Sequence, residues 1–175
     1  MLFNINDSIV ILERTPMVLE TLLTGLNEKW TSNNEGGDTW SPFDVLGHLI
    51  HGEKTDWIPR MMIVLDEKDN KKFTPFDRFA QFKESKGKTL GDLLEEFKML
   101  RCKNLAILKE IKITEEMLNL KGIHPEFGEV TLQQLLATWV VHDLGHLCQT
   151  TRVMAKQYKQ EIGPWTKYFS IFNKG

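Results

Sequence analysis

The chain has 175 residues, of which 41% are hydrophobic, and its formal net charge is −2 at pH 7. Ten phenylalanines in a chain of this length are enough to build a full core, which predicts a single domain over residues 1–175. The charge balance offers no basic field for nucleic acid, and no apolar run reaches the roughly 18 to 20 residues of a membrane span. Because the N-terminus also lacks a signal-peptide pattern, we expect a cytoplasmic protein that binds neither nucleic acid nor membranes.

Helical signals dominate the N-terminal half. A threonine–proline pair at residues 15–16 predicts an N-cap and first helical residue, and this first helix ends near Gly25. A serine–proline pair at residues 41–42 gives the same signal for a second helix, which runs into the mid-sixties. Pro59 falls inside the second helix, where it lacks a backbone donor, so a kink or break is expected near Trp57.

The remaining sequence predicts one long connection and two more helices. Residues 66–88 combine a charged run with scattered aromatic residues, and we expect a connection with a short helix at about residues 76–82. Apolar residues at helical spacing predict a third long helix over residues 89–111. Residues 121–130 predict a loop, after which a fourth helix runs over residues 131–158.

Four long helices and no clear strand predict an all-α protein, a helical bundle. The two cysteines, Cys102 and Cys148, fall among apolar residues of these helices and are expected to be buried, reduced thiols. After Pro164 the chain continues as an apolar tail with several aromatic residues. This tail must cover something, either its own bundle or a second copy of the chain in a homodimer.

The fourth predicted helix carries two histidines four residues apart, in the run Trp139-Val-Val-His142-Asp-Leu-Gly-His146. Four residues are a little more than one helical turn, so both imidazoles project from one face and can share a metal ion. His48, on the second helix, lies in a similar apolar setting. One interpretation is that hydrogen bonds in the core satisfy each ring. The other is a three-histidine site that leaves positions open on a divalent ion, as catalytic sites do.

The segment Trp40-Ser-Pro-Phe-Asp-Val-Leu-Gly-His48-Leu-Ile, with the later run from Trp139 to His146, resembles the DinB-like superfamily, which includes the YfiT-type metal-dependent hydrolases. The resemblance extends along nearly the whole chain. It implies a four-helix bundle of up-down-down-up order, with a long crossover between the second and third helices. It also implies a divalent ion held by His48, His142 and His146. Imidazole ligands suit zinc, nickel, copper or iron, of which zinc or nickel is expected.

The same resemblance suggests an activity. Characterised members are described as thiol S-transferases that use bacillithiol or mycothiol, and one branch isomerises maleylpyruvate with a thiol cofactor. This favours a metal-dependent transferase that joins a low-molecular-weight thiol to an electrophilic small-molecule substrate. Two alternatives stay open: a metal-dependent hydrolase that activates water, and a non-catalytic, stress-associated metal-binding protein. Many relatives read H-D-x-D-H across the histidine pair, whereas this chain has Gly145 in place of the second acidic residue.

Few residues near the histidines are candidates for accessory catalytic roles. Glu53 and Asp56 follow His48 on the same predicted helix, and either carboxylate could act as a base or orient a ligand. Arg60 lies further along and could contact an anionic substrate if the kink at Pro59 turns it inward. The alternative for the two carboxylates is that they are exposed charges on a helix face.

Three other polar residues are a rival metal ligand or have a structural interpretation. His51 is a rival metal ligand, because it lies three positions after His48. Asp143 points away from the histidine face and is expected to pair with a basic residue of a neighbouring helix. His124 falls in the predicted loop and is expected to face solvent.

Overall fold

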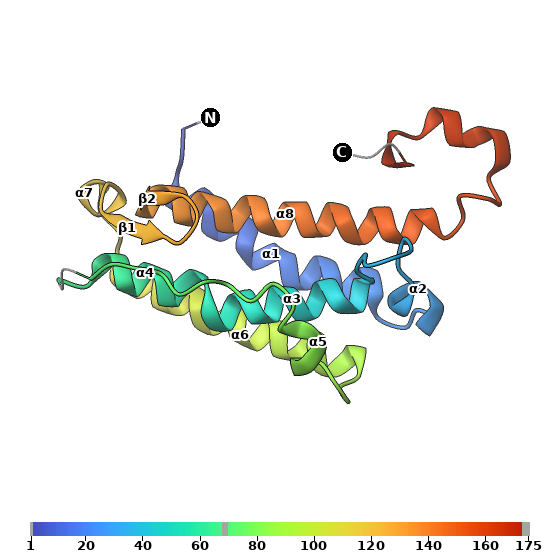
Figure 1. Cartoon of the computed structure of the whole chain (residues 1–175), viewed down its shortest axis with the longest axis horizontal. Helices are drawn as coiled ribbons and strands as arrows, with labels where there is room; N and C mark the ends of the chain where they lie inside the picture. The colour runs from blue at the N-terminus through green and yellow to red at the C-terminus, as the bar shows by residue number, and fades with distance from the viewer. Residues whose placement is uncertain (1, 68–69, 173–175) are drawn as a thin grey trace.

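The computed structural model describes residues 2–67 and 70–172 and shows four long helical stretches that pack lengthwise (Figure 1). The bundle is formed by α1 (Ile5–Leu23), α3 (Pro42–Thr55) with α4 (Trp57–Leu65), α6 (Leu90–Ile111) and α8 (Leu132–Lys156). The shorter elements are α2 (Glu28–Ser32), α5 (Gln81–Glu84), α7 (Glu115–Leu118), β1 (Lys121–His124), β2 (Gly128–Thr131), and the 3-10 turns η1 (Gly163–Tyr168) and η2 (Ser170–Phe172). In the described part of the chain, no helix is long and apolar enough to span a membrane.

The four stretches follow the order up, down, down, up. In Figure 1, α1 and α8 run in one direction, and α3, α4 and α6 run in the other. This order is possible because the connection from α4 to α6 returns along the bundle to the end where α3 begins. Both α1 and α3 pack against α6 and α8. The four-helix bundle predicted from the sequence is confirmed.

The second bundle helix is broken at Asp56, close to the predicted position. Its start follows the local signal, because Ser41 and Asp44 form a capping box in which each side chain accepts the other's backbone N–H. Pro59 has no N–H, so the carbonyl of Thr55 loses its usual helical partner and the chain turns before α4 resumes. Both segments remain packed on α8.

The first helix begins at Ile5, so the start predicted at the threonine–proline pair is wrong. Asn4 caps it, and its side chain accepts two backbone N–H groups of the first turn. Pro16 therefore lies inside the helix, where it leaves the carbonyl of Leu12 without its usual donor. The buried Arg101 supplies the missing donor, with its Nη1 atom 2.8 Å from the Leu12 oxygen. A contact from another helix thus allows the proline.

The segment predicted as a loop after α7 forms a two-stranded antiparallel hairpin, β1–β2. A hairpin this short is marginal by itself, and here the chain after α4 supports it. The backbone N–H of Phe73 donates to the carbonyl of Ile123 at 2.9 Å. Gly122 permits the close approach, since a Cβ at that position would lie 2.5 Å from the Phe73 ring. Contacts distant in sequence therefore decide this structure.

Three smaller expectations also differ. The short helix predicted at residues 76–82 lies later, as α5. Cys102 and Cys148 are exposed, so the prediction that both thiols are buried is wrong. In the case of Cys102, the preceding residue Arg101 faces the core, and the next position on a helix turns by about 100° towards solvent. In the tail, η2 packs on α8, while three large rings remain exposed: Trp165, Tyr168 and Phe169.

Candidate metal centre

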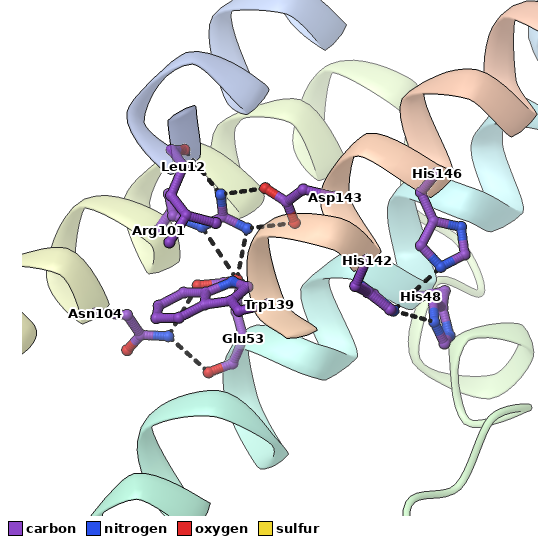
Figure 2. Close-up of polar contacts among 9 residues, drawn as sticks. All are labelled: Leu12, His48, Glu53, Arg101, Asn104, Trp139, His142, Asp143 and His146. Carbon is purple, nitrogen blue, oxygen red and sulfur yellow. Dashed lines mark hydrogen bonds and ion pairs between the residues drawn. The ribbon is translucent and has the colours of Figure 1, made fainter. Parts of the chain in front are cut away.

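The structure brings His48 of α3 together with His142 and His146 of α8 (Figure 2). The Nε2 atom of His142 lies 3.1 Å from Nε2 of His48 and 3.1 Å from Nε2 of His146. For metal–nitrogen bonds of about 2.1 Å, neighbouring ligand atoms lie about 3.0 to 3.4 Å apart in octahedral or tetrahedral geometry. The observed spacing of this histidine triad therefore fits a shared divalent ion.

Hydrogen bonding prepares one of the rings for this role. The side-chain oxygen of Gln149 lies 2.8 Å from Nδ1 of His146. Because this oxygen accepts a hydrogen bond from the Nδ1–H group, the proton of the neutral ring is on Nδ1 and the Nε2 lone pair stays free to bind an ion. The Nδ1 atoms of His48 and His142 are buried, and no partner for them lies among the described residues.

Aromatic rings enclose the triad and keep it uncharged. The Trp40 ring lies 4.7 Å from that of His48 and stacks on His146 at 6.2 Å, while Trp57 meets His142 at 5.1 Å. Burial in this setting lowers the pKa of His48 to about 3 and that of His142 to about 2, and it also lowers the pKa of His146. All three imidazoles are therefore neutral at pH 7, as metal ligands must be.

The triad opens into an elongated cleft of about 890 Å³. Its walls come from the loop before α3, from α3 and α4, from residues 73–79 and from the β1–β2 hairpin. One stripe of α8 forms the floor: Gln134, Leu135, Thr138, His142, His146, Gln149 and Arg152. From Gln134 to Arg152 the helix advances by about 27 Å, and the histidines lie near the middle of this length.

The three accessory candidates lie in two places. Asp56 and Arg60 line the cleft and form an ion pair, with Nε of Arg60 2.5 Å from Oδ1 of Asp56. Glu53 belongs to a separate buried cluster behind the triad (Figure 2). All three side chains are buried, so the interpretation of the two carboxylates as exposed charges is wrong.

Arg101 of α6 is the centre of the buried cluster, and its guanidinium contacts two carboxylates. It donates to Oε1 of Glu53 at 3.1 and 2.8 Å, and to the two oxygens of Asp143 at 2.6 and 3.0 Å. Trp139 and Asn104 also donate to the Glu53 carboxylate. Burial raises the pKa of Glu53, and the charge of Arg101 opposes that shift. The expected pairing of Asp143 with a basic residue of a neighbouring helix is confirmed.

Other polar residues are placed differently from expectation. His51 lies outside the triad, and its Nδ1 atom is 3.1 Å from the carboxylate of Glu84. His124 is half-buried and lines the cleft, so it is only partly open to solvent. Arg78, which the sequence did not single out, also lines the cleft, and its charge adds to burial in lowering the pKa of His48. Both newly placed residues come from connections whose path depends on tertiary contacts.

A family model described as the DinB superfamily matches residues 11–150. The chain belongs to the DinB superfamily. Among solved structures, this DinB protein is similar to YfiT from Bacillus subtilis, described as a probable metal-dependent hydrolase with an unusual four-helix bundle topology. The two share 19% sequence identity and a TM-score of 0.73, over 87% of this chain and 86% of that one. Comparison with curated proteins gives no match. The DinB match contains the whole histidine triad, whereas the C-terminal tail lies beyond it.

Proposed function

We propose that His48, His142 and His146 bind a divalent metal ion, zinc or nickel, on the floor of the cleft. The proposal is carried by the convergence of three uncharged rings at a spacing that suits one ion. Three protein ligands leave positions open for a substrate, as in catalytic sites. YfiT, which has the same fold, is described as a probable metal-dependent hydrolase, and this description supports a metal here.

We further propose that the protein is a transferase that joins a low-molecular-weight thiol to an electrophilic small molecule. A divalent ion supplies positive charge that favours the ionised form of a bound thiol or water. The size of the cleft supports two reactants, because about 890 Å³ lies near the upper end of the roughly 300 to 1,000 Å³ of small-molecule sites. Arg78, which lines the same cleft, provides a cation for a carboxylate on either reactant.

Hydrolysis is the second candidate, favoured by the likeness to YfiT. Attack by water benefits from a carboxylate that takes up a proton. The two carboxylates considered as bases are already engaged, Glu53 by Arg101 and Asp56 by Arg60. A thiol has less need of such a base, since its unperturbed pKa of about 8.5 lies close to neutrality. We therefore place transfer before hydrolysis.

Metal analysis of protein purified without a histidine tag tests the site. We expect about one zinc or nickel ion per chain, and background levels after His48→Ala, His142→Ala or His146→Ala. His51→Ala is the matched control, because this buried histidine of α3 lies outside the triad and should leave the metal content unchanged. Wild-type protein without stoichiometric metal, refolded in the presence of each ion, would rule the site out.

Turnover measurements separate the candidate activities. We expect metal-loaded protein to accelerate the reaction of a thiol with a fluorogenic bimane halide, and His142→Ala to abolish the acceleration. Hydrolysis of activated esters without any thiol would favour the hydrolase. A metal-loaded protein that accelerates neither reaction, over a panel of cysteine, glutathione, coenzyme A and bacillithiol, would contradict the transferase and favour a non-catalytic metal-binding protein.

A further inference from the structure

His124, the last residue of β1, has its ring held by the hairpin that follows it. The backbone N–H groups of Glu126 and Phe127 point to its Nδ1 atom, at 3.2 and 3.3 Å. The Phe127 ring stacks on the imidazole, with centroids 4.5 Å apart and planes inclined by 13°. Phe73 meets the imidazole edge-on, with centroids 6.4 Å apart. Two hydrogen bonds and two rings therefore fix its orientation.

This arrangement determines which ring nitrogen carries the proton. Because Nδ1 accepts two backbone N–H groups, the proton of the neutral ring must be on Nε2. Burial lowers the pKa of His124, and the charge of Arg60 lowers it further, so the ring is neutral at pH 7. Within residues 2–67 and 70–172, no protein group accepts the Nε2 proton. Since His124 lines the cleft, this donor is available to a ligand.

The hairpin borders one end of the cleft, away from the triad. β2 runs directly into α8, and Gln134, in the first turn of α8, lines the same end. From Gln134 to His142 the helix advances by about 12 Å. A ligand that reaches both the triad and His124 therefore needs reactive and accepting groups on the order of 10 Å apart.

We propose that His124 is a ligand-contacting residue, whose Nε2–H donates to a carbonyl or carboxylate oxygen at the far end of an elongated thiol. The inference rests on the proposed function, because that function places the sulfur at the triad. It adds a substrate class: thiols that carry an oxygen acceptor several bonds beyond their cysteine-like part. Cysteine itself is too short to span the two positions.

The variant His124→Asn separates ligand contact from the hairpin cap. The asparagine oxygen can accept the same two backbone N–H groups, as in an Asx turn, but the side chain has no group at the Nε2 position. His124→Ala removes both functions. We expect His124→Asn to keep the thermal midpoint of the wild type, and His124→Ala to lower it.

Calorimetric titration of the metal-loaded protein with bacillithiol, glutathione and L-cysteine tests the contact. We expect the two longer thiols to bind the wild type more tightly than cysteine does. His124→Asn should lower the affinity for a longer thiol by about 3- to 10-fold, because one hydrogen bond is lost, and should leave the affinity for cysteine unchanged. Equal wild-type affinities for all three thiols, or a longer thiol unaffected by His124→Asn, would overturn the proposal.

A second variant distinguishes this inference from the proposed function. If the sulfur binds at the triad, His142→Ala weakens all three thiols together. If His142→Ala changes the affinity for none of the thiols while His124→Asn still lowers the affinity for the longer ones, the thiol site at the triad is wrong and the contact with His124 stands. If His142→Ala lowers the affinity for all three thiols and His124→Asn lowers it for none, the triad site stands and His124 serves only as a hairpin cap.

Discussion

Different contacts hold the three rings of the triad. His146 is oriented by a hydrogen bond to Gln149, whereas His48 and His142 are held by aromatic neighbours and lack a partner for Nδ1 among the described residues. Hydrogen bonds to ligating histidines fix the tautomer and the direction of the lone pair. Of the three rings, His146 is therefore oriented most specifically, and its contribution to metal affinity should depend on Gln149.

Substitution of Gln149 should weaken metal binding without removing a ligand. We expect Gln149→Ala to lower metal affinity by about 10- to 100-fold, because His146 can then rotate or change tautomer. Gln149→Glu keeps an acceptor at this position and should retain affinity. Competition with a chromophoric chelator measures both variants, and quenching of the nearby Trp40 and Trp57 by nickel gives an independent reading. An unchanged affinity for Gln149→Ala would show that packing alone holds the ring.

At Gly145, between the two histidines of α8, the structure shows open space. A Cβ built at this position meets no atom within 4 Å, and the residue lies in the interior of α8. We expect Gly145→Ala to raise the free energy of unfolding by about 0.5 to 1 kcal/mol, because glycine is costly inside helices. Metal content should stay at the wild-type level. Urea unfolding and metal analysis check this, and destabilisation or metal loss would mean that the space is occupied in solution.

At the scale of the elements, the Arg101 cluster joins all four bundle helices. The guanidinium on α6 contacts the Leu12 carbonyl of α1, Glu53 of α3 and Asp143 of α8 (Figure 2). The Leu12 carbonyl needs this donor because of the proline one turn later. Asp143 is adjacent to a triad residue in sequence, so the cluster also fixes the rotation of α8 that aims the histidines at the cleft.

Loss of Arg101 should be far more damaging than loss of an exposed cation of the same helix. We expect Arg101→Leu to lower the free energy of unfolding by about 3 to 5 kcal/mol, because two carboxylates and a carbonyl lose their buried partner. Lys98→Leu, which removes an exposed ion pair with Glu20, should cost less than about 1 kcal/mol. Urea unfolding of both variants measures the difference. Equal effects would mean that water enters the cluster and replaces the guanidinium.

The sequence predicts elements whose signals are local. The helix start at Ser41 and the break before Pro59 depend on neighbouring residues, and both were predicted close to their positions. The start of α1 was not predicted correctly, because Pro16 is accommodated inside the helix by an arginine 85 positions later in the chain. The same limit applies to the hairpin and to His124, whose place in the cleft depends on contacts with residues that precede α6.

The triad illustrates both sides of this limit. The i, i+4 spacing of His142 and His146 is a local signal and placed them on one face of a helix. His48 was proposed as the third ligand from its similar apolar setting on another helix, the resemblance supported it, and the structure brings the three rings together. For Glu53 the sequence could not decide between a site residue and a structural one, because the choice depends on the burial of Arg101.

At the scale of the whole molecule, the cleft is bounded by contacts at both ends of α8. At the C-terminal end, Glu35 in the loop before α3 accepts from Arg152 at 3.0 and 2.9 Å and lies 2.7 Å from Lys156. The bond to Arg152 is the main cause that lowers the pKa of Glu35 to about 2. At the N-terminal end, the hairpin closes the cleft beside Asp56 and Arg60. The stability of the metal-free protein therefore depends on ion pairs at the two ends of the cleft and on the uncharged histidine triad between them.

These histidines should make the metal-free protein sensitive to acid. In the unfolded chain each takes up a proton near pH 6.5, whereas in the folded protein His48 stays neutral down to about pH 3 and His142 to about pH 2. The unfolded state then binds more protons over this interval, so stability falls as pH decreases below 6.5 and is insensitive to these groups above it. We expect a loss that approaches about 1.4 kcal/mol per pH unit for each histidine.

Urea unfolding in the presence of a chelator, at steps from pH 7.5 to 5, measures this slope. The double variant His48→Asn, His142→Asn has no titrating group at these two positions, so its stability should fall less steeply between pH 6.5 and 5. Glu35 does not interfere in this window, because its stabilising contribution is present above pH 4.5 and is lost only as pH falls from 4.5 towards 2. If wild type and double variant had the same slope, the triad would be protonated and hydrated in the folded metal-free protein. Bound metal should not reduce this slope, because the ion also keeps protons off the Nε2 atoms of the folded protein while the unfolded chain still takes them up.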